Sequence, residues 1–82
     1  MKKRNTIKGF TVSTAPMGAW DGRSETMVFD ASGEEVDSIR VPMHKARAAH
    51  RHFVGLYKLG ALANYYRSSV GESAQRAALR AD

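Results

Sequence analysis

The pattern of hydrophobic and polar positions changes once along the chain, at Pro42. Before this proline, short runs alternate between apolar and polar residues, which is typical of strands with one buried face. After it, residues 43–66 contain no further proline and are rich in Ala, Leu, Arg and Lys, a composition that favours a helix. The sequence therefore predicts an α+β fold with a β-rich first half and one long C-terminal helix.

Three segments have the composition of strands and predict an antiparallel meander over 6–41: 6–13, 24–30 and 36–41. In the first segment Ile7 is out of phase with Phe10 and Val12, and a bulge at Gly9 would restore the alternation. We expect the resulting three-stranded sheet to pack on the long helix.

Turn-forming residues and the two ends of the chain complete the predicted organisation. Residues 15–22 contain Pro, Gly and an Asp-Gly pair and predict a loop. Residues 30–33 are a strong turn signal for a short hairpin, with Gly33 at positive φ. Residues 1–5 predict a flexible basic tip, and 72–82 predict either a short final helix or a tail.

The first four turns of the predicted helix are amphipathic when the residues are placed at about 100° intervals. Small and aromatic apolar side chains share one face: Ala46, Ala49, Phe53, Leu56 and Tyr57. Basic side chains share the opposite face: His44, Arg47, Arg51 and Lys58. We expect the apolar face to pack on the sheet and the second set, called here the basic ladder, to face solvent.

Beyond Lys58 the apolar pattern moves to the face that carries the basic ladder. Leu59, Leu62 and Tyr66 follow one another at intervals of three and four residues and form an apolar stripe. A bend around Gly60 would turn this stripe onto the same core. A straight helix would expose it to a partner, most simply a second copy of the chain, and a folded-back tail would cover it. An apolar patch is rarely left bare on a soluble monomer.

Length and composition exclude several classes of protein. The chain has 82 residues, enough for one small domain over 1–82, and no cysteine, so it has neither disulfides nor thiolate metal sites. No apolar run is long enough for a transmembrane helix, and no apolar stretch follows the basic start as in a signal peptide. We exclude a large enzyme and a secreted mini-protein, and expect a cytoplasmic location, with the nucleus as the alternative.

The positive charge is concentrated in one part of the chain. The net charge is +5, and residues 38–71 contain six Lys or Arg and no Asp or Glu. Segregation of this kind is expected of a protein that binds polyanions. The alternative is a solvated basic face that keeps a small protein soluble.

The sequence predicts neither a catalytic nor a metal site. His44, His50 and His52 do not share a helix face, and no HExxH pattern accompanies them. We expect these histidines to be solvated or to face phosphates. No nucleophile elbow, phosphate-binding loop or dinucleotide fingerprint occurs, so we expect a non-catalytic protein without a cofactor.

Nucleic-acid binding is the leading functional hypothesis, with DNA and RNA both open. Its candidate residues are basic side chains on or beside the helix: Arg40, His44, Lys45, Arg47, Arg51 and Lys58. Cations at every helical turn can contact successive phosphates. A second binding mode would place the sheet in a major groove, with Arg23, Thr26 and Arg40 pointing outward.

The rival hypothesis is a protein-binding regulator or inhibitor, for example a phage-encoded one that acts on a host enzyme or nucleoprotein complex. Its interface residues would be apolar: Trp20, Leu59, Leu62 and Tyr66. Trp20 has a second interpretation, as a lid over the end of the core. We expect no membrane binding, because Ala46 and Ala49 make the apolar face of the helix shallow.

Overall fold

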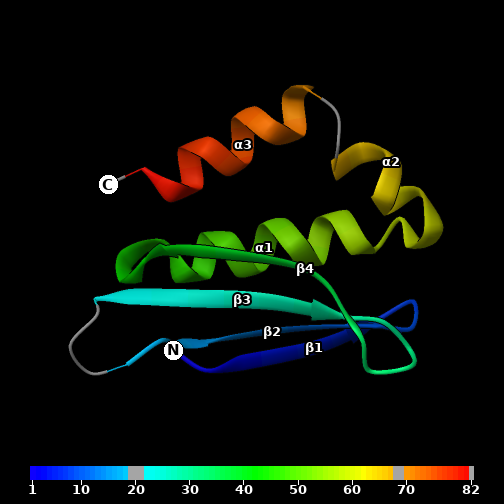
Figure 1. Ribbon diagram of the computed structural model, residues 1–82, viewed down its shortest axis with the longest axis horizontal. Coiled ribbons are helices and arrows are strands. Elements are labelled where there is room, and N and C mark those ends of the chain that lie inside the picture. The colour runs from blue at the N-terminus through cyan, green and yellow to red at the C-terminus, as the bar shows by residue number, and fades with distance from the viewer. Residues whose placement is uncertain (19–21, 68–69, 82) are drawn as a thin grey trace.

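The computed structural model describes residues 1–18, 22–67 and 70–81, and in them four antiparallel strands precede the helices (Figure 1). The strands are β1 (Lys3–Ile7), β2 (Phe10–Pro16), β3 (Arg23–Phe29) and β4 (Glu35–Pro42). Their spatial order is β1-β2-β3-β4, so each strand pairs with its neighbours in sequence. The predicted α+β class and antiparallel meander are confirmed, but the sheet has four strands where the sequence predicted three.

The additional strand comes from segment 6–13, which forms parts of two strands joined by a tight turn. The turn residues Lys8 and Gly9 have φ values of 54° and 84°. Positive φ at both central residues is what a type I′ hairpin turn requires. Ile7 pairs with Phe10 across this turn. The change of phase in the sequence therefore marks a reversal of the chain, and the predicted bulge at Gly9 is wrong.

The start of the chain also differs from the prediction, whereas the second turn agrees with it. Residues 3–5 belong to β1, so the first strand begins within the segment that was expected to be a flexible tip. Gly33 has the expected positive φ, 86°. One carboxylate oxygen of Asp30 accepts hydrogen bonds from the backbone N–H groups of Ser32 and Glu34. The hydrogen bonds from Ser32 and Glu34 lower the pKa of Asp30.

The predicted long helix is divided into shorter pieces. These are η1 (Met43–Lys45), α1 (Ala46–Tyr57), η2 (Gly60–Leu62) and α2 (Ala63–Arg67), and they are followed by α3 (Val70–Arg80). Gly60 has a φ of 61°, which is incompatible with a continuing right-handed helix. The bend around Gly60 is thus present, and the last part of the chain is a helix and not a tail.

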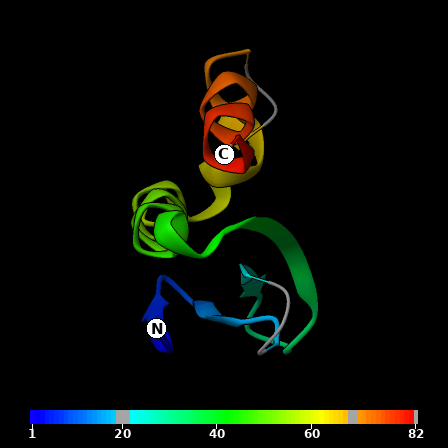
Figure 2. The same cartoon turned by 90° about the vertical axis from the view of Figure 1, so that its left-hand side faces the viewer.

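The described helices all lie on one side of the sheet (Figure 2). α1 rests on the sheet, and α2 and α3 lie beyond α1, with α3 contacting β4. The core between sheet and helices contains Val12, Val28, Ile39, Val41, Ala49, Phe53, Leu56, Tyr57 and Ala63. The predicted apolar face of the helix is confirmed, because its five residues are all buried.

Candidate nucleic-acid interface

The basic ladder is exposed along η1 and α1 and ends at Lys58, just after α1, and part of it faces the edge strand β1. His44, Arg47, Arg51 and Lys58 are all exposed. A groove of about 480 Å³ separates α1 from β1, and its lining residues are Met1, Lys3, Asn5, Arg47, His50, Arg51 and Val54. None of these lining residues is acidic. We call this feature the β1–α1 groove.

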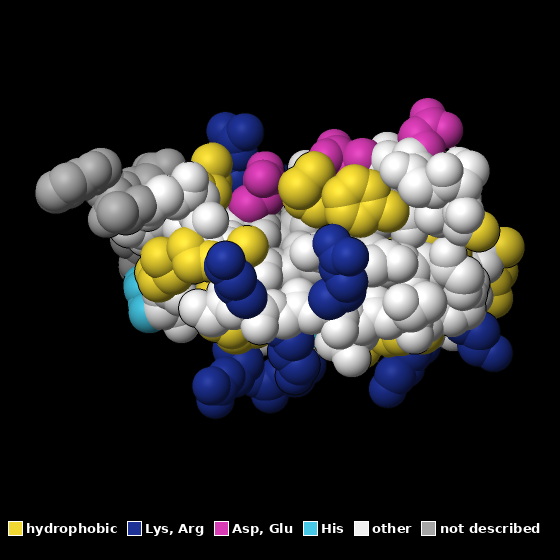
Figure 3. Space-filling model, turned by 90° about the horizontal axis from the view of Figure 1, so that it is seen from below, with side chains coloured by type: hydrophobic (Ala, Val, Ile, Leu, Met, Phe, Trp, Pro, Cys, Tyr) yellow, Lys and Arg dark blue, Asp and Glu magenta, His cyan; other side chains and the backbone are white. Residues whose placement is uncertain are grey.

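Charge is distributed unevenly over the surface. Lys and Arg side chains crowd one long edge of the molecule, whereas Asp and Glu side chains lie toward the opposite edge (Figure 3). Lys2, Lys3 and Arg4 belong to the region of β1, while Glu34 and Glu35 lie at the start of β4, the other edge strand. The fold therefore separates basic from acidic side chains more completely than their order in the sequence does.

A buried chain of hydrogen bonds lies beneath the β1–α1 groove. His50 is 2% exposed. Its Nε2 is 2.7 Å from Oδ1 of Asn5, and its Nδ1 is 2.7 Å from the hydroxyl of Thr14. The Thr14 hydroxyl is in turn 2.6 Å from that of Thr26. An amide oxygen only accepts, so Nε2–H donates to Asn5, and in a neutral imidazole Nδ1 then accepts from the Thr14 hydroxyl.

The environment of His50 favours the same neutral state. Burial lowers the pKa of His50, and the nearby charge of Lys3 lowers it further. The expectation that His50 is solvated or faces a phosphate is therefore wrong. The imidazole instead holds α1 against β1 and β2, and so fixes the position of the adjacent Arg47 and Arg51.

Two of the predicted nucleic-acid ligands are engaged in contacts within the protein. Arg40 lies on the sheet face turned away from α1 and pairs with Glu25, with Nε 3.2 Å from Oε2. Nζ of Lys45 donates a hydrogen bond of 2.7 Å to the backbone carbonyl of Ala78 in α3. The six predicted side chains therefore do not form one surface, and the ladder on α1 is the part that remains together.

The open face of the sheet differs from the surface that the second binding mode assumed. The alternation of β3 places Arg23 on this face, like Arg40 of β4. Thr26 is fully buried and faces α1, so its predicted outward orientation is wrong. Its place on the open face is taken by its sequence neighbour Met27 and by Phe29, both half-buried.

Comparisons with protein-family models, curated proteins and solved structures find no match for this chain. Among the described residues, no group of three or more His, Cys, Asp or Glu is placed to hold a metal ion. In the same part of the chain, no helix is both long and apolar enough to cross a membrane. Trp20, a predicted interface residue, lies outside the described residues.

A second charged cluster, which the sequence analysis missed, attaches the C-terminal helix. The carboxylate of Asp37 receives two hydrogen bonds from Arg76, of 2.7 and 2.5 Å, and one of 2.7 Å from the Tyr57 hydroxyl. Nη1 of Arg67 is 3.8 Å from the same carboxylate. Arg67 is one of the six cations of 38–71, so one of those charges lies beside a carboxylate inside the protein, which Arg67 shares with Arg76.

The pKa values of this cluster follow from its burial and its charges. Burial raises the pKa of Asp37, but the contacts with Arg76, Tyr57 and Arg67 lower it more, and the net pKa lies below its usual value. Burial and the Asp37 carboxylate raise the pKa of Tyr57 to about 12. Over a wide pH range the phenol therefore keeps its proton and donates to an ionised carboxylate.

The apolar stripe beyond Lys58 remains exposed in spite of the bend. The exposed fractions of Leu59, Leu62 and Tyr66 are 44%, 58% and 46%, and that of Tyr65 is 71%. Ala63 is the buried residue of this region. The expectation that a bend turns the stripe onto the core is thus wrong, because the turn at Gly60 directs Ala63 inward instead.

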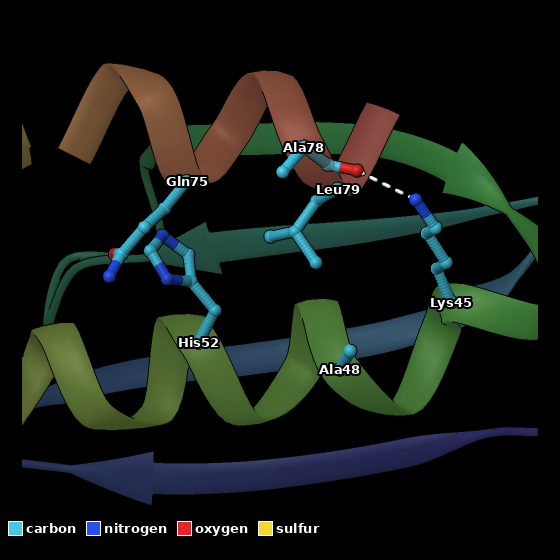
Figure 4. Close-up of a pocket in the computed structure, with 6 residues that line it drawn as sticks. All are labelled: Lys45, Ala48, His52, Gln75, Ala78 and Leu79. Carbon is cyan, nitrogen blue, oxygen red and sulfur yellow. Dashed lines mark hydrogen bonds between the residues drawn. The ribbon is translucent and has the colours of Figure 1, made fainter. Parts of the chain in front are cut away.

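A shallow hollow of about 350 Å³ lies between α1 and α3 (Figure 4). Its residues are Lys45, Ala48, His52, Gln75, Ala78 and Leu79. The side chains of His52 and Gln75 point toward each other from the facing helices, and Leu79 points toward α1.

Proposed function

We propose that this protein binds nucleic acid through phosphate contacts made in the β1–α1 groove and along the basic ladder. The observation that carries the proposal is the meeting of Lys3, Arg47 and Arg51, which come from two separate elements, in a groove with no acidic lining residue. Guanidinium groups bind phosphate oxygens through paired hydrogen bonds. Contacts of this kind give affinity without reading base sequence.

The length of the ladder suits a nucleic-acid backbone. His44 and Lys58 are exposed and lie fourteen residues apart on the same side of the helical region, which corresponds to about 21 Å along a helix axis. A strand of duplex DNA carries a phosphate about every 3.4 Å along its axis. The ladder is therefore long enough to follow several phosphates.

The test uses a double charge reversal with a matched control. Arg47→Glu with Arg51→Glu is compared with Lys8→Glu with Arg80→Glu, which changes the net charge equally at exposed positions outside the groove. Binding of a fluorescent oligothymidylate of about 20 nucleotides and of a duplex of similar length is measured at about 20 and 150 mM salt.

We expect the unaltered protein to bind with a slope of roughly −2 in log affinity against log salt for the single strand, as three phosphate contacts predict. The groove variant should lose at least about tenfold in affinity and most of this slope, while the control keeps both. Equal losses in the two variants, or no binding by the unaltered protein at low salt, would contradict the proposal.

A second candidate function, a protein-binding regulator or inhibitor, rests on the exposure of Leu59, Leu62 and Tyr66. Leu62→Asp should abolish binding to a protein partner or to a second copy while the fold survives, because the Leu62 side chain is 58% exposed. Light scattering and circular dichroism, with the adjacent Ala61→Asp as control, test this. Unfolding of the Leu62 variant would show that the stripe belongs to the core.

A further inference from the structure

β1 is an edge strand, and its free edge borders the β1–α1 groove. The sheet order leaves one side of β1 without a partner strand among the described residues. In a hairpin with a two-residue turn, the pair next to the turn exchanges both backbone hydrogen bonds. That pair is Ile7 with Phe10, and the register continues without a shift to Lys3 with Thr14. By alternation, the N–H and C=O groups of Arg4 and Thr6 point away from β2.

We propose that an extended acidic segment of another protein binds here by adding to β1 as a fifth strand. The free backbone groups of Arg4 and Thr6 would supply its main-chain hydrogen bonds. Alternate side chains of the added strand would point to the helix side of the sheet, into the β1–α1 groove. Lys3, Arg47 and Arg51 line that space, so acidic side chains complement it.

The charge of β1 argues against a second copy of this chain as the occupant. Lys2, Lys3 and Arg4 lie in or next to β1, and Lys8 occupies the turn that follows it. Pairing β1 with β1 of another copy would place cations beside cations, which destabilises strand pairing. The same cations attract an acidic segment.

This inference goes beyond nucleic-acid binding, although both ligands would use Arg47 and Arg51. They differ in one respect, because strand addition needs the free N–H groups of β1 and phosphate binding does not. Thr6→Pro removes one of these N–H groups, and proline is tolerated on an edge strand where the N–H faces solvent. Thr6→Val keeps the N–H and serves as the matched control.

The probe is an acetylated and amidated octapeptide of alternating Glu and Val, compared with its Lys and Val counterpart. We expect the full-length protein to bind the acidic peptide only, with affinity unchanged in Thr6→Val and reduced at least about tenfold in Thr6→Pro. In the unaltered protein, bound peptide should also slow solvent exchange of the Arg4 and Thr6 amide protons. Oligothymidylate binding should be equal in the two Thr6 variants.

Equal peptide affinity in the two Thr6 variants, or unchanged amide exchange at Arg4 and Thr6, would overturn strand addition. Such a result, with oligothymidylate still bound, would leave a groove that binds polyanions through its cations alone. If the unaltered protein does not bind oligothymidylate while bound peptide still slows amide exchange at Arg4 and Thr6, nucleic-acid binding would instead be contradicted. If circular dichroism shows that Thr6→Pro is unfolded, amide exchange in the unaltered protein decides the question.

Discussion

Thr14 is the central member of the hydrogen-bond chain beneath the β1–α1 groove, since its hydroxyl contacts both His50 and Thr26. Valine matches threonine in shape but has no hydroxyl. Thr14→Val would leave Nδ1 of His50 and the Thr26 hydroxyl without this buried partner. We expect a loss of about 1–3 kcal/mol in the free energy of unfolding, measured by urea denaturation.

The control for this prediction is Thr11→Val, on the same strand but on the open face of the sheet. The control should change the free energy of unfolding by less than about 0.5 kcal/mol. An equally small effect at Thr14 would show that the chain of hydrogen bonds contributes nothing measurable to stability.

At the level of single residues, the helical pattern predicted exposure of the ladder correctly but failed for His50. On the helical projection, His50 lies at the border of the apolar face. Its partners Asn5 and Thr14 come from two strands, 45 and 36 residues away in sequence. Periodicity within one helix carries no information about such partners, so the burial of His50 depends on tertiary contacts that the pattern does not contain.

At the level of elements, the β1–β2 hairpin depends on the positive φ of Gly9. A Cβ at Gly9 would meet only the Cβ of Ala31, at 4.0 Å, so Gly9→Ala costs only backbone strain. We expect a loss of about 1 kcal/mol in the free energy of unfolding. Gly55 lies within α1, where a Cβ meets nothing within 4 Å. Gly55→Ala should therefore stabilise by about 0.5–1 kcal/mol.

Urea denaturation of both glycine variants tests these two predictions, in which the free energy of unfolding changes in opposite directions. The comparison is informative because both substitutions add the same methyl group without a clash, and only the backbone conformation differs. Stabilisation by Gly9→Ala would mean that the turn adopts a negative φ, so that β1 and β2 are joined differently.

The attachment of α3 depends on Arg76, which binds Asp37 and lies 4.7 Å above the ring of Phe53. Arg76→Gln would remove the charge that compensates a buried carboxylate, at a cost of about 2 kcal/mol or more. Hydrogen exchange should show that α3 amides lose protection while those of α1 keep it. The exposed Arg80→Gln is the control, and equal exchange in the two variants would contradict this role of Arg76.

The sequence predicted the elements better than their boundaries. The strands within 24–30 and 36–41 and the turn at Gly33 were found because alternation and turn chemistry are local signals. The first hairpin was missed although the apolar alternation changes phase at Ile7. A bulge and a two-residue turn produce the same change of phase, so the pattern did not distinguish between them. Whether the stripe is buried could not be predicted, because the direction of the chain after the positive φ at Gly60 does not follow from periodicity.

For the whole molecule, the fold determines which cations are available to a ligand. Arg67 and Arg76 share the carboxylate of Asp37, and Arg40 pairs with Glu25. The remaining candidate surface therefore combines the exposed ladder of α1 with Lys3, which the sequence assigned to a flexible tip. The groove was not predictable, because it joins residues 1–5 to residues 47–54, which lie far apart in sequence and meet only in the folded protein.

The pH dependence of stability tests both buried clusters at once. The pKa of His50 is lowered in the folded protein, so its contribution is present above about 6.5 and is lost as the pH falls through the folded pKa. The pKa of Asp37 is also lowered, so its contribution to stability is present above its ordinary pKa of 3.8 and is lost as the pH falls through the folded pKa. The pKa of Tyr57 is raised to about 12, so its contribution is present below about 10 and is lost as the pH rises through 12.

We therefore expect the free energy of unfolding to be greatest and nearly constant between about pH 7 and 10, and to fall on both sides. Urea denaturation from pH 4 to 11 measures this profile. Between about pH 5 and 7 the profile depends on a neutral His50, so His50→Gln should flatten the profile there, and Tyr57→Phe should flatten its alkaline side. A rise in stability of the unaltered protein on acidification from pH 7 to 5 would mean that folding favours a protonated imidazole, and the hydrogen bond donated by Thr14 to Nδ1 would then be assigned in the wrong direction.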